Sequence, residues 1–122
     1  MEERRGARRW AVNKDAELQV QDQSNVFPCI VEDLSTSGMR ISLGRNLFPE
    51  VFSKITLALG DALSFDAGAH VAWQESQDNR NTYGLSFSNI DQGQRNRIER
   101  YINNNFTDQI LESNNDQWWK GF

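Results

Sequence analysis

Residues 26–43 read VFPCIVEDLSTSGMRISL, and this stretch decides the fold. Its first part, Val26 to Leu34, is apolar and β-branched with Pro28 near its start, which is typical of a strand that begins there or lies at an edge. A short segment of Asp, Ser and Gly residues follows, as in a turn. In residues 38–43, apolar and polar side chains alternate with period two. The stretch predicts two strands joined by a turn, the second with Met39, Ile41 and Leu43 on one face.

The same pattern continues on both sides of this stretch. Apolar and polar residues alternate in further short segments, and polar turns such as QDNRN at 77–81 separate them. Six or seven strands at this spacing predict an antiparallel barrel or sandwich. Residues 62–76 fit two short strands or one bent strand. The other expected strands cover residues 16–21, 54–59 and 82–90.

From Asp91 onward the period changes to that of a helix. Asp91 is a good N-cap residue and is followed by a polar first turn. Apolar residues then recur at spacings of three and four, so one helix is expected after the strands. Residues 107–122 are polar and aromatic, and we expect at most a short helical turn around Ile110. The apolar face of the helix consists of Ile98, Tyr101, Ile102 and Phe106.

Composition limits the classes of protein to consider. A chain of 122 residues with 38% hydrophobic and 25% charged residues suits one globular domain with a real core. The formal net charge of -4 disfavours general nucleic-acid binding except through a local basic patch. No apolar stretch approaches the roughly 20 residues of a membrane span, and no apolar segment follows the first residues as in a secretory signal. We therefore expect a cytoplasmic protein with no membrane partner, in which the single cysteine, Cys29, is a buried thiol.

A basic cluster stands at the start of this acidic chain. The first ten residues read MEERRGARRW, and four of them are arginines. Such a run can be a solvated tail, an arm that binds nucleic acid, or a clamp for one phosphorylated ligand. The cluster consists of Arg4, Arg5, Arg8 and Arg9.

The turn DLSTSG, residues 33–38, also carries potential chemistry. Asp and Ser side chains often bond their own backbone in turns, and Gly supplies a positive φ, so an ordinary strand connection is favoured when the turn is taken alone. The same residues offer short acceptors, a hydroxyl donor and backbone N–H groups. These groups can hold guanine edges, ribose hydroxyls and phosphate oxygens.

Together, the arginine cluster and the turn resemble the two-part signature of the PilZ domain family, RxxxR followed by [DN]xSxxG. Arg5 and Arg9 fit the first part, and residues 33–38 fit the second. Arg4 and Arg8 also satisfy RxxxR. The first register is preferred because family members often have a further arginine where Arg4 stands and an apolar residue where Trp10 stands. The segments AHVAW, YGLSF and RYI are similar to later elements of the family, so the resemblance covers about residues 3–106.

The resemblance implies a six-stranded antiparallel β-barrel with a C-terminal α-helix, spanning residues 1–106 with the N-terminal arginine segment, and a tail at 107–122. It also implies a receptor, not an enzyme, whose ligand is the second messenger cyclic di-GMP and which needs no cofactor. Arginine suits this ligand, because its planar fork pairs with phosphate oxygens or with the guanine O6 and N7 atoms. In the implied site, Arg5 and Arg9 are the main ligands and Gly38 allows close backbone approach. The remaining implied contacts are Arg4 as their neighbour, Arg8 as a further candidate, and Asp33 and Ser35 on the other guanine.

Several other residues have both a structural and a functional interpretation. Trp73, which alternation places on the same face as Val71, is a core aromatic or a platform that stacks on guanine, as in some similar proteins. Arg40 is a solvated strand charge or a phosphate contact, and His70 lacks partners for metal binding or catalysis. Near the end of the chain, Trp118, Trp119 and Phe122 pack back on the domain or form a docking surface.

The leading hypothesis is therefore a cyclic di-GMP receptor whose N-terminal segment becomes ordered over the barrel when ligand binds. Its effector would be a protein of motility, exopolysaccharide production, biofilm formation or another bacterial signalling system. We expect a monomer or a weak dimer that does not bind nucleic acid. The alternatives are a PilZ-like adaptor that docks on proteins without nucleotide, and a small barrel that binds nucleic acid through the arginine arm. An enzyme has the least support, because no nucleophile with a base and no metal cluster emerges.

Overall fold

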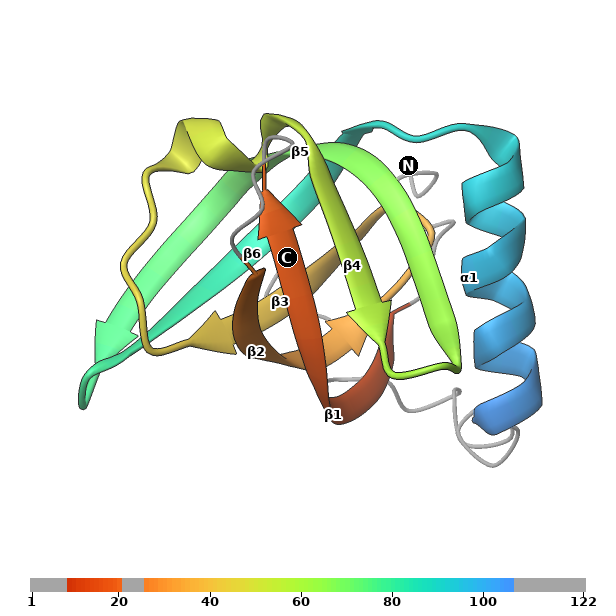
Figure 1. The fold of residues 1–122 in the computed structure, drawn as a ribbon, viewed down its shortest axis with the longest axis horizontal. Coiled ribbons are helices and arrows are strands. Elements are labelled where there is room, and N and C mark those ends of the chain that lie inside the picture. The colour runs from red at the N-terminus through yellow and green to blue at the C-terminus, as the bar shows by residue number, and fades with distance from the viewer. Residues whose placement is uncertain (1–8, 21–25, 107–122) are drawn as a thin grey trace, which may run out of the picture.

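A computed structural model describes residues 9–20 and 26–106 as six strands, a 3-10 helix and one α-helix (Figure 1). The 3-10 helix, η2, spans Pro49–Ser53, and the α-helix, α1, spans Gln92–Asn105. The strands are β1 (Trp10–Val20), β2 (Val26–Leu34), β3 (Gly38–Leu43), β4 (Ile55–Leu59), β5 (Leu63–Gln77) and β6 (Arg80–Asn89).

The strands form one closed barrel in the order β1-β2-β3-β6-β5-β4. Every neighbouring pair is antiparallel, and β1 closes the ring by pairing with both β2 and β4. Within residues 9–20 and 26–106, each strand therefore pairs with a neighbour on both sides over at least part of its length. The predicted antiparallel barrel is confirmed, with six strands in the described residues.

Alternation along the strands fills the interior. Met39, Ile41 and Leu43 are at most 1% exposed and lie on the inner face of β3, as their period predicts. The 3-10 helix contributes Phe52, whose ring centroid lies 5.0 Å from that of Tyr83 on β6. The core thus continues from the barrel wall into the connection between β3 and β4.

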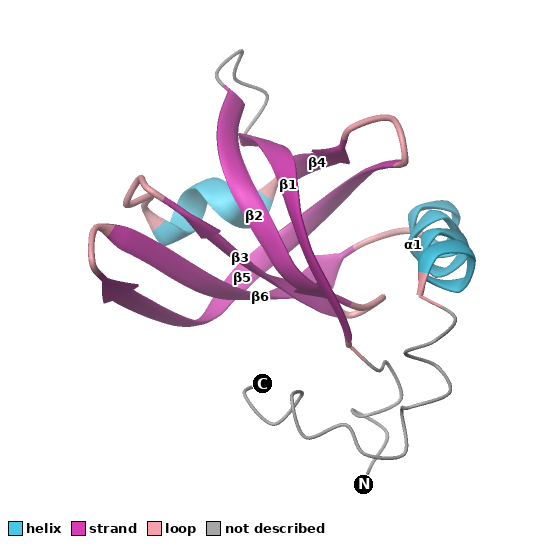
Figure 2. Cartoon of the chain, turned by 90° about the horizontal axis from the view of Figure 1, so that it is seen from below, coloured by secondary structure: helices cyan, strands magenta, loops and turns pink. Residues whose placement is uncertain are grey.

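The helix α1 lies beside the barrel, next to β5, and not within it (Figure 2). Asp91 caps it, accepting a hydrogen bond from the Gln94 N–H at 3.0 Å. Its apolar face is the predicted one, with Ile98, Tyr101 and Ile102 buried. The predicted helix is confirmed at both its start and its buried face.

Three strands depart from simple alternation. β1 begins at Trp10, well before the expected residue 16, because an irregularity between Ala11 and Lys14 breaks its period; Asn13 there has a φ of 51°. β5 is one bent strand of 15 residues, with register shifts at 68/69 and 71/73. β2 has a shift between Val31 and Asp33.

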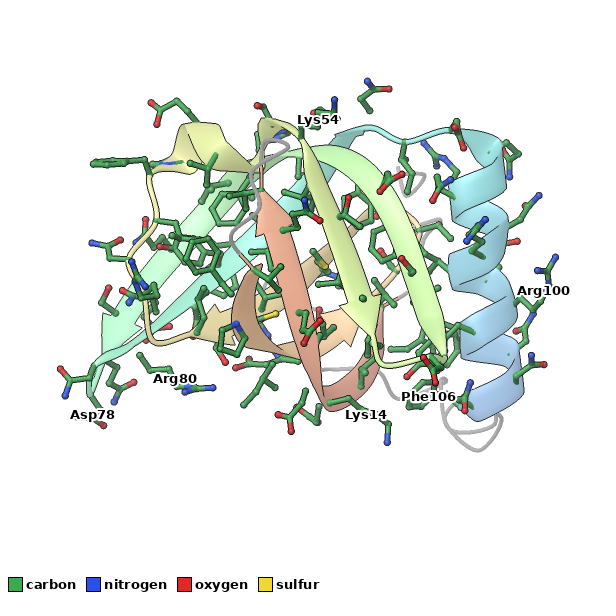
Figure 3. All side chains as sticks on the ribbon, viewed as in Figure 1. Lys14, Lys54, Asp78, Arg80, Arg100 and Phe106 are labelled. Carbon is green, nitrogen blue, oxygen red and sulfur yellow. The ribbon has the colours of Figure 1, made fainter. Side chains whose placement is uncertain are left out.

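The hairpin of β5 and β6 ends in a two-residue turn, Asp78 and Asn79, with φ values of 53° and 64°. Positive φ at both positions suits the twist of antiparallel strands. Figure 3 places Asp78 and Arg80 at this end of the barrel, far from Arg100 on α1. The polar run predicted to be a turn is therefore confirmed.

The residues 107–122, with the expected helical turn and the aromatic tail, lie outside the described residues. Arg4, Arg5 and Arg8 also lie outside them. In the part of the chain that is described, no helix has the length and apolar character that a membrane crossing requires.

Candidate functional site

Four of the residues around the predicted site form a row across neighbouring strands. Asp33 on β2 pairs with Arg40 on β3, Arg40 pairs with Gly84 on β6, and Gly84 pairs with Trp73 on β5. Cross-strand partners share one face of a sheet. The row lies on the outer face, because Met39 next to Arg40 belongs to the core. The register thus brings Asp33 and Trp73, 40 positions apart in sequence, to one surface.

A bulge at Glu32 directs Asp33 to this surface. Val31 pairs with Ile41 and Asp33 pairs with Arg40, so Glu32 is an extra residue on β2 with no partner position on β3. Without the extra residue, period two would place Asp33 on the same face as Val31, in the core. The bulge moves the carboxylate to the outer face and lets Leu34, which is 0% exposed, return to the interior.

Asp33 is buried even though it lies on the outer face. Its side chain is 1% exposed, and Arg40 Nη2 lies 3.1 Å from Asp33 Oδ2. Burial raises the pKa of Asp33 to about 6, although the positive charges of Arg40 and Arg9 oppose that rise. The carboxylate is therefore covered by neighbouring side chains and is less acidic than an ordinary aspartate.

Arg9 is the one motif arginine within the described residues. It precedes β1 and stands two positions before Ala11, the β1 partner of Asp33. Burial lowers the pKa of Arg9 to about 10, with attraction by Asp33 opposing and repulsion by Arg40 adding to that fall. At neutral pH Arg9 remains a cation, so two guanidinium groups act on one carboxylate.

Arg40 holds two carboxylates. Its Nε lies 3.1 Å from Glu32 Oε1, while its Nη2 contacts Asp33. The side chains of Arg40 and Glu32 are each 29% exposed. The expectation of a solvated strand charge is therefore wrong, because the bulge brings Glu32 and Asp33 to the same guanidinium.

Ser35 and Gly38 shape the turn that follows β2. The Ser35 hydroxyl accepts hydrogen bonds from the Ser37 N–H at 3.0 Å and the Gly38 N–H at 3.1 Å. A Cβ on Gly38 would lie 2.3 Å from the Leu85 carbonyl oxygen on β6. Close approach of the β6 backbone therefore requires glycine here. The positive φ expected of glycine in this turn is recorded at Gly60 and not at Gly38.

Trp73 lies against Gly84. A Cβ on Gly84 would lie 2.3 Å from Trp73 Nε1 and 2.5 Å from Cε2, so the indole covers the glycine. Val71 pairs with Leu85 in the core, whereas Trp73 pairs with Gly84 on the outer face. The expectation that Trp73 shares the face of Val71 is wrong, because a bulge at Ala72 shifts the alternation. Trp73 is half-buried on the outer wall.

The structure therefore brings together Arg9, Asp33, Arg40 and Trp73, and it places Ser35 and Gly38 in the adjoining turn. Glu32 and Gly84 were missed by the sequence reasoning. In the sequence, Glu32 is marked only by its position next to Asp33, and Gly84 only as the glycine of YGLSF. Neither signal reveals the bulge at Glu32 or the indole that covers Gly84.

Comparison with solved structures gives the same fold. YcgR from Escherichia coli in complex with c-di-GMP matches with a TM-score of 0.67 and 16% identity, over 91% of this chain and 50% of that one. The inhibitor of motility MotI/DgrA of Bacillus subtilis matches with a TM-score of 0.60 and 16% identity, over 84% and 51%. The chain thus spans about half the length of these two proteins.

The PilZ domain of Escherichia coli YcgR with c-di-GMP is similar at a TM-score of 0.64 and 15% identity, over 93% of this chain and 99% of that domain. No curated protein sequence matches this chain. The model of the PilZ domain matches residues 3–104, which include both motif segments, all six strands and most of α1. The chain therefore belongs to the PilZ domain family.

Proposed function

We propose that this chain is a receptor for cyclic di-GMP and not an enzyme. The observation that carries the proposal is the buried Asp33 carboxylate on the outer wall, with Arg9 and Arg40 acting on it and Trp73 in the same row. Such a group of arginines, a carboxylate and an indole offers what a molecule with two guanines and two phosphates needs. Two of the similar solved structures contain c-di-GMP, which agrees with the proposal.

Each side chain has a chemical role in this proposal. Arg9, with Arg5 and Arg4 before it, pairs with phosphate oxygens or guanine acceptors through its planar fork. A carboxylate offers about four acceptor positions, so Asp33, whose side chain is 1% exposed, can accept guanine N–H groups once a covering side chain moves. The indole of Trp73 provides an apolar plane on which a base can stack.

The N-terminal segment provides the signalling step. Arg9 directly precedes β1, and residues 3–8, which the family match also covers, come before Arg9 in the sequence. A nucleotide that contacts Arg5 and the barrel wall together orders this segment over the outer face and offers a new surface to an effector. The name of MotI, an inhibitor of motility, makes the motility machinery a suitable class of effector to test.

Titration calorimetry with cyclic di-GMP tests the proposal. We expect binding by the wild type and a loss of affinity of about fivefold to a hundredfold or more for Arg5→Ala and Arg9→Ala, since a bidentate contact contributes about 1–3 kcal/mol. Arg100→Ala is the control, because Arg100 is exposed on α1 (Figure 3), whereas the row belongs to the barrel strands β2, β3, β5 and β6. Thermal melting of each variant separates lost binding from lost folding.

If the folded wild type gives no heat of binding with cyclic di-GMP, the receptor proposal is refuted and a protein-docking adaptor is favoured. Binding of unrelated RNA or DNA that falls steeply as salt rises would instead favour the nucleic-acid alternative. Equal loss of binding in Arg100→Ala would contradict the position of the site.

A further inference from the structure

We infer that Glu32 limits the affinity of the site for its nucleotide by holding Arg40 over Asp33. The inference rests on the proposed function and concerns the regulation of that same site. Glu32 is not one of the residues that define either motif. Its contact with Arg40 arises only from the bulge in β2.

The first step is the geometry of the restraint. Arg40 lies between two carboxylates, with Nε 3.1 Å from Glu32 Oε1 and Nη2 3.1 Å from Asp33 Oδ2. Two contacts from different nitrogens fix both the position and the plane of a guanidinium. Arg40 is thereby held against Asp33 more firmly than one carboxylate would hold it.

The second step is access to Asp33. Its side chain is 1% exposed, and Arg40 is in direct contact with one of its oxygens. A guanine that donates N–H groups to this carboxylate therefore needs a covering side chain to move. When Arg40 moves, it must give up its contact with Glu32 as well as change its contact with Asp33.

The third step is charge. Arg9, Arg40, Glu32 and Asp33 carry two positive and two negative charges, so their group is neutral when all are ionised. An incoming ligand with two phosphates meets no net attraction from these four residues. Neutralising Glu32 leaves one net positive charge and weakens the contact of Glu32 with Arg40 Nε, since a neutral carbonyl oxygen attracts a guanidinium less than a carboxylate does. Arg40 can then turn more easily to a phosphate oxygen, and both changes favour an anion.

Calorimetric titration of cyclic di-GMP into the full chain tests the inference with Glu32→Gln. We expect binding about threefold to tenfold tighter than wild type, the range for a partly exposed ion pair and a charge-assisted hydrogen bond. Glu17→Gln is the matched control. Glu17 is exposed on β1, pairs with Pro28 and Ala58, and its loss changes the net charge equally. We expect this control to bind within about twofold of wild type.

The same titration with Arg40→Gln and with the double variant identifies the route of the effect. If Glu32 acts mainly by restraining Arg40, Glu32→Gln tightens binding clearly less in the Arg40→Gln background than in the wild type. In that background the substitution only removes a negative charge, and no guanidinium remains to be released. Equal tightening in both backgrounds would show direct repulsion of the phosphates and overturn the role given to Arg40.

The outcomes separate the two proposals. If the wild type binds cyclic di-GMP and Glu32→Gln binds it with equal or lower affinity, the inference is overturned and the receptor function still stands. Folded wild type that does not bind removes the receptor function, and the inference fails with it.

Discussion

Replacing Gly84 by alanine should displace Trp73 and destabilise the barrel. The new Cβ would lie 2.3 Å from Trp73 Nε1, 2.5 Å from Cε2 and 2.9 Å from Cδ1. Ordinary van der Waals contact begins near 3.4 Å, so the indole must retreat by roughly 1 Å. Adding a methyl group to a filled position costs about 1–3 kcal/mol of the free energy of unfolding.

Urea denaturation of four proteins measures this cost and assigns its cause. We compare wild type, Gly84→Ala, Trp73→Ala and the double variant. The three nearest atoms to the added methyl group all belong to Trp73. The alanine at 84 should therefore cost little in the Trp73→Ala background, which gives a coupling free energy of about 1–3 kcal/mol. With a urea slope of about 1–3 kcal/mol per molar, Gly84→Ala shifts the midpoint by about 1 M.

Gly44→Ala is the control, because a Cβ there meets no atom within 4 Å. If Gly84→Ala lowers stability equally with and without Trp73, the indole does not cover Gly84 and the reasoning is refuted. The proposed function adds one expectation, which is weaker nucleotide binding by Gly84→Ala. Base stacking contributes about 1–3 kcal/mol, which sets the upper limit of that loss.

Three further results are expected. Affinity for cyclic di-GMP should fall as pH drops below about 6, by up to about tenfold per pH unit, because the pKa of Asp33 is raised to about 6 and its ionised form accepts guanine N–H groups on both oxygens and more strongly than its protonated form. Asp33→Asn should lack this dependence, and a flat wild-type profile between pH 7 and roughly 4.5 would argue against the contact. Gly38→Ala should lower the free energy of unfolding by about 1–3 kcal/mol in urea, since its Cβ would meet the Leu85 carbonyl oxygen at 2.3 Å, and unchanged stability would contradict the close approach of β3 and β6. Cys29, whose thiol pKa is raised to about 12 by burial and by Asp15, should react with a chromogenic disulfide at pH 8 only after unfolding, a result that fast labelling of the folded protein would overturn.

Much of the fold could be predicted from the sequence, because the relevant signals are local. The bounds of β2 and β3 agree with the expected Val26–Leu34 and Gly38–Leu43, and Asp91 caps the helix as expected. In each segment, apolar residues recur with a period of two or at spacings of three and four, and a turn or capping residue stands at the end of the segment. The motif residues were also found locally, since each part of the signature spans only a few positions.

The bulges could not be predicted in this way. No particular residue type marks an extra residue such as Glu32 or Ala72 in the sequence. The extra residue nevertheless reverses the face of the sheet that every following side chain of the strand occupies. Alternation alone therefore put Trp73 on the wrong face, and it left Arg40 without the carboxylates that hold it.

The sequence by itself determined the strands, the helix, the family resemblance and the residue types available to the site. The tertiary structure decided that Asp33, Arg40, Gly84 and Trp73 stand in one row on the outer wall, with Asp33 and Glu32 both facing Arg40. The physical reason is that whether a segment forms a strand depends largely on residues near one another along the chain. The composition of the site depends instead on register between strands far apart in sequence, and a bulge of one residue changes that register.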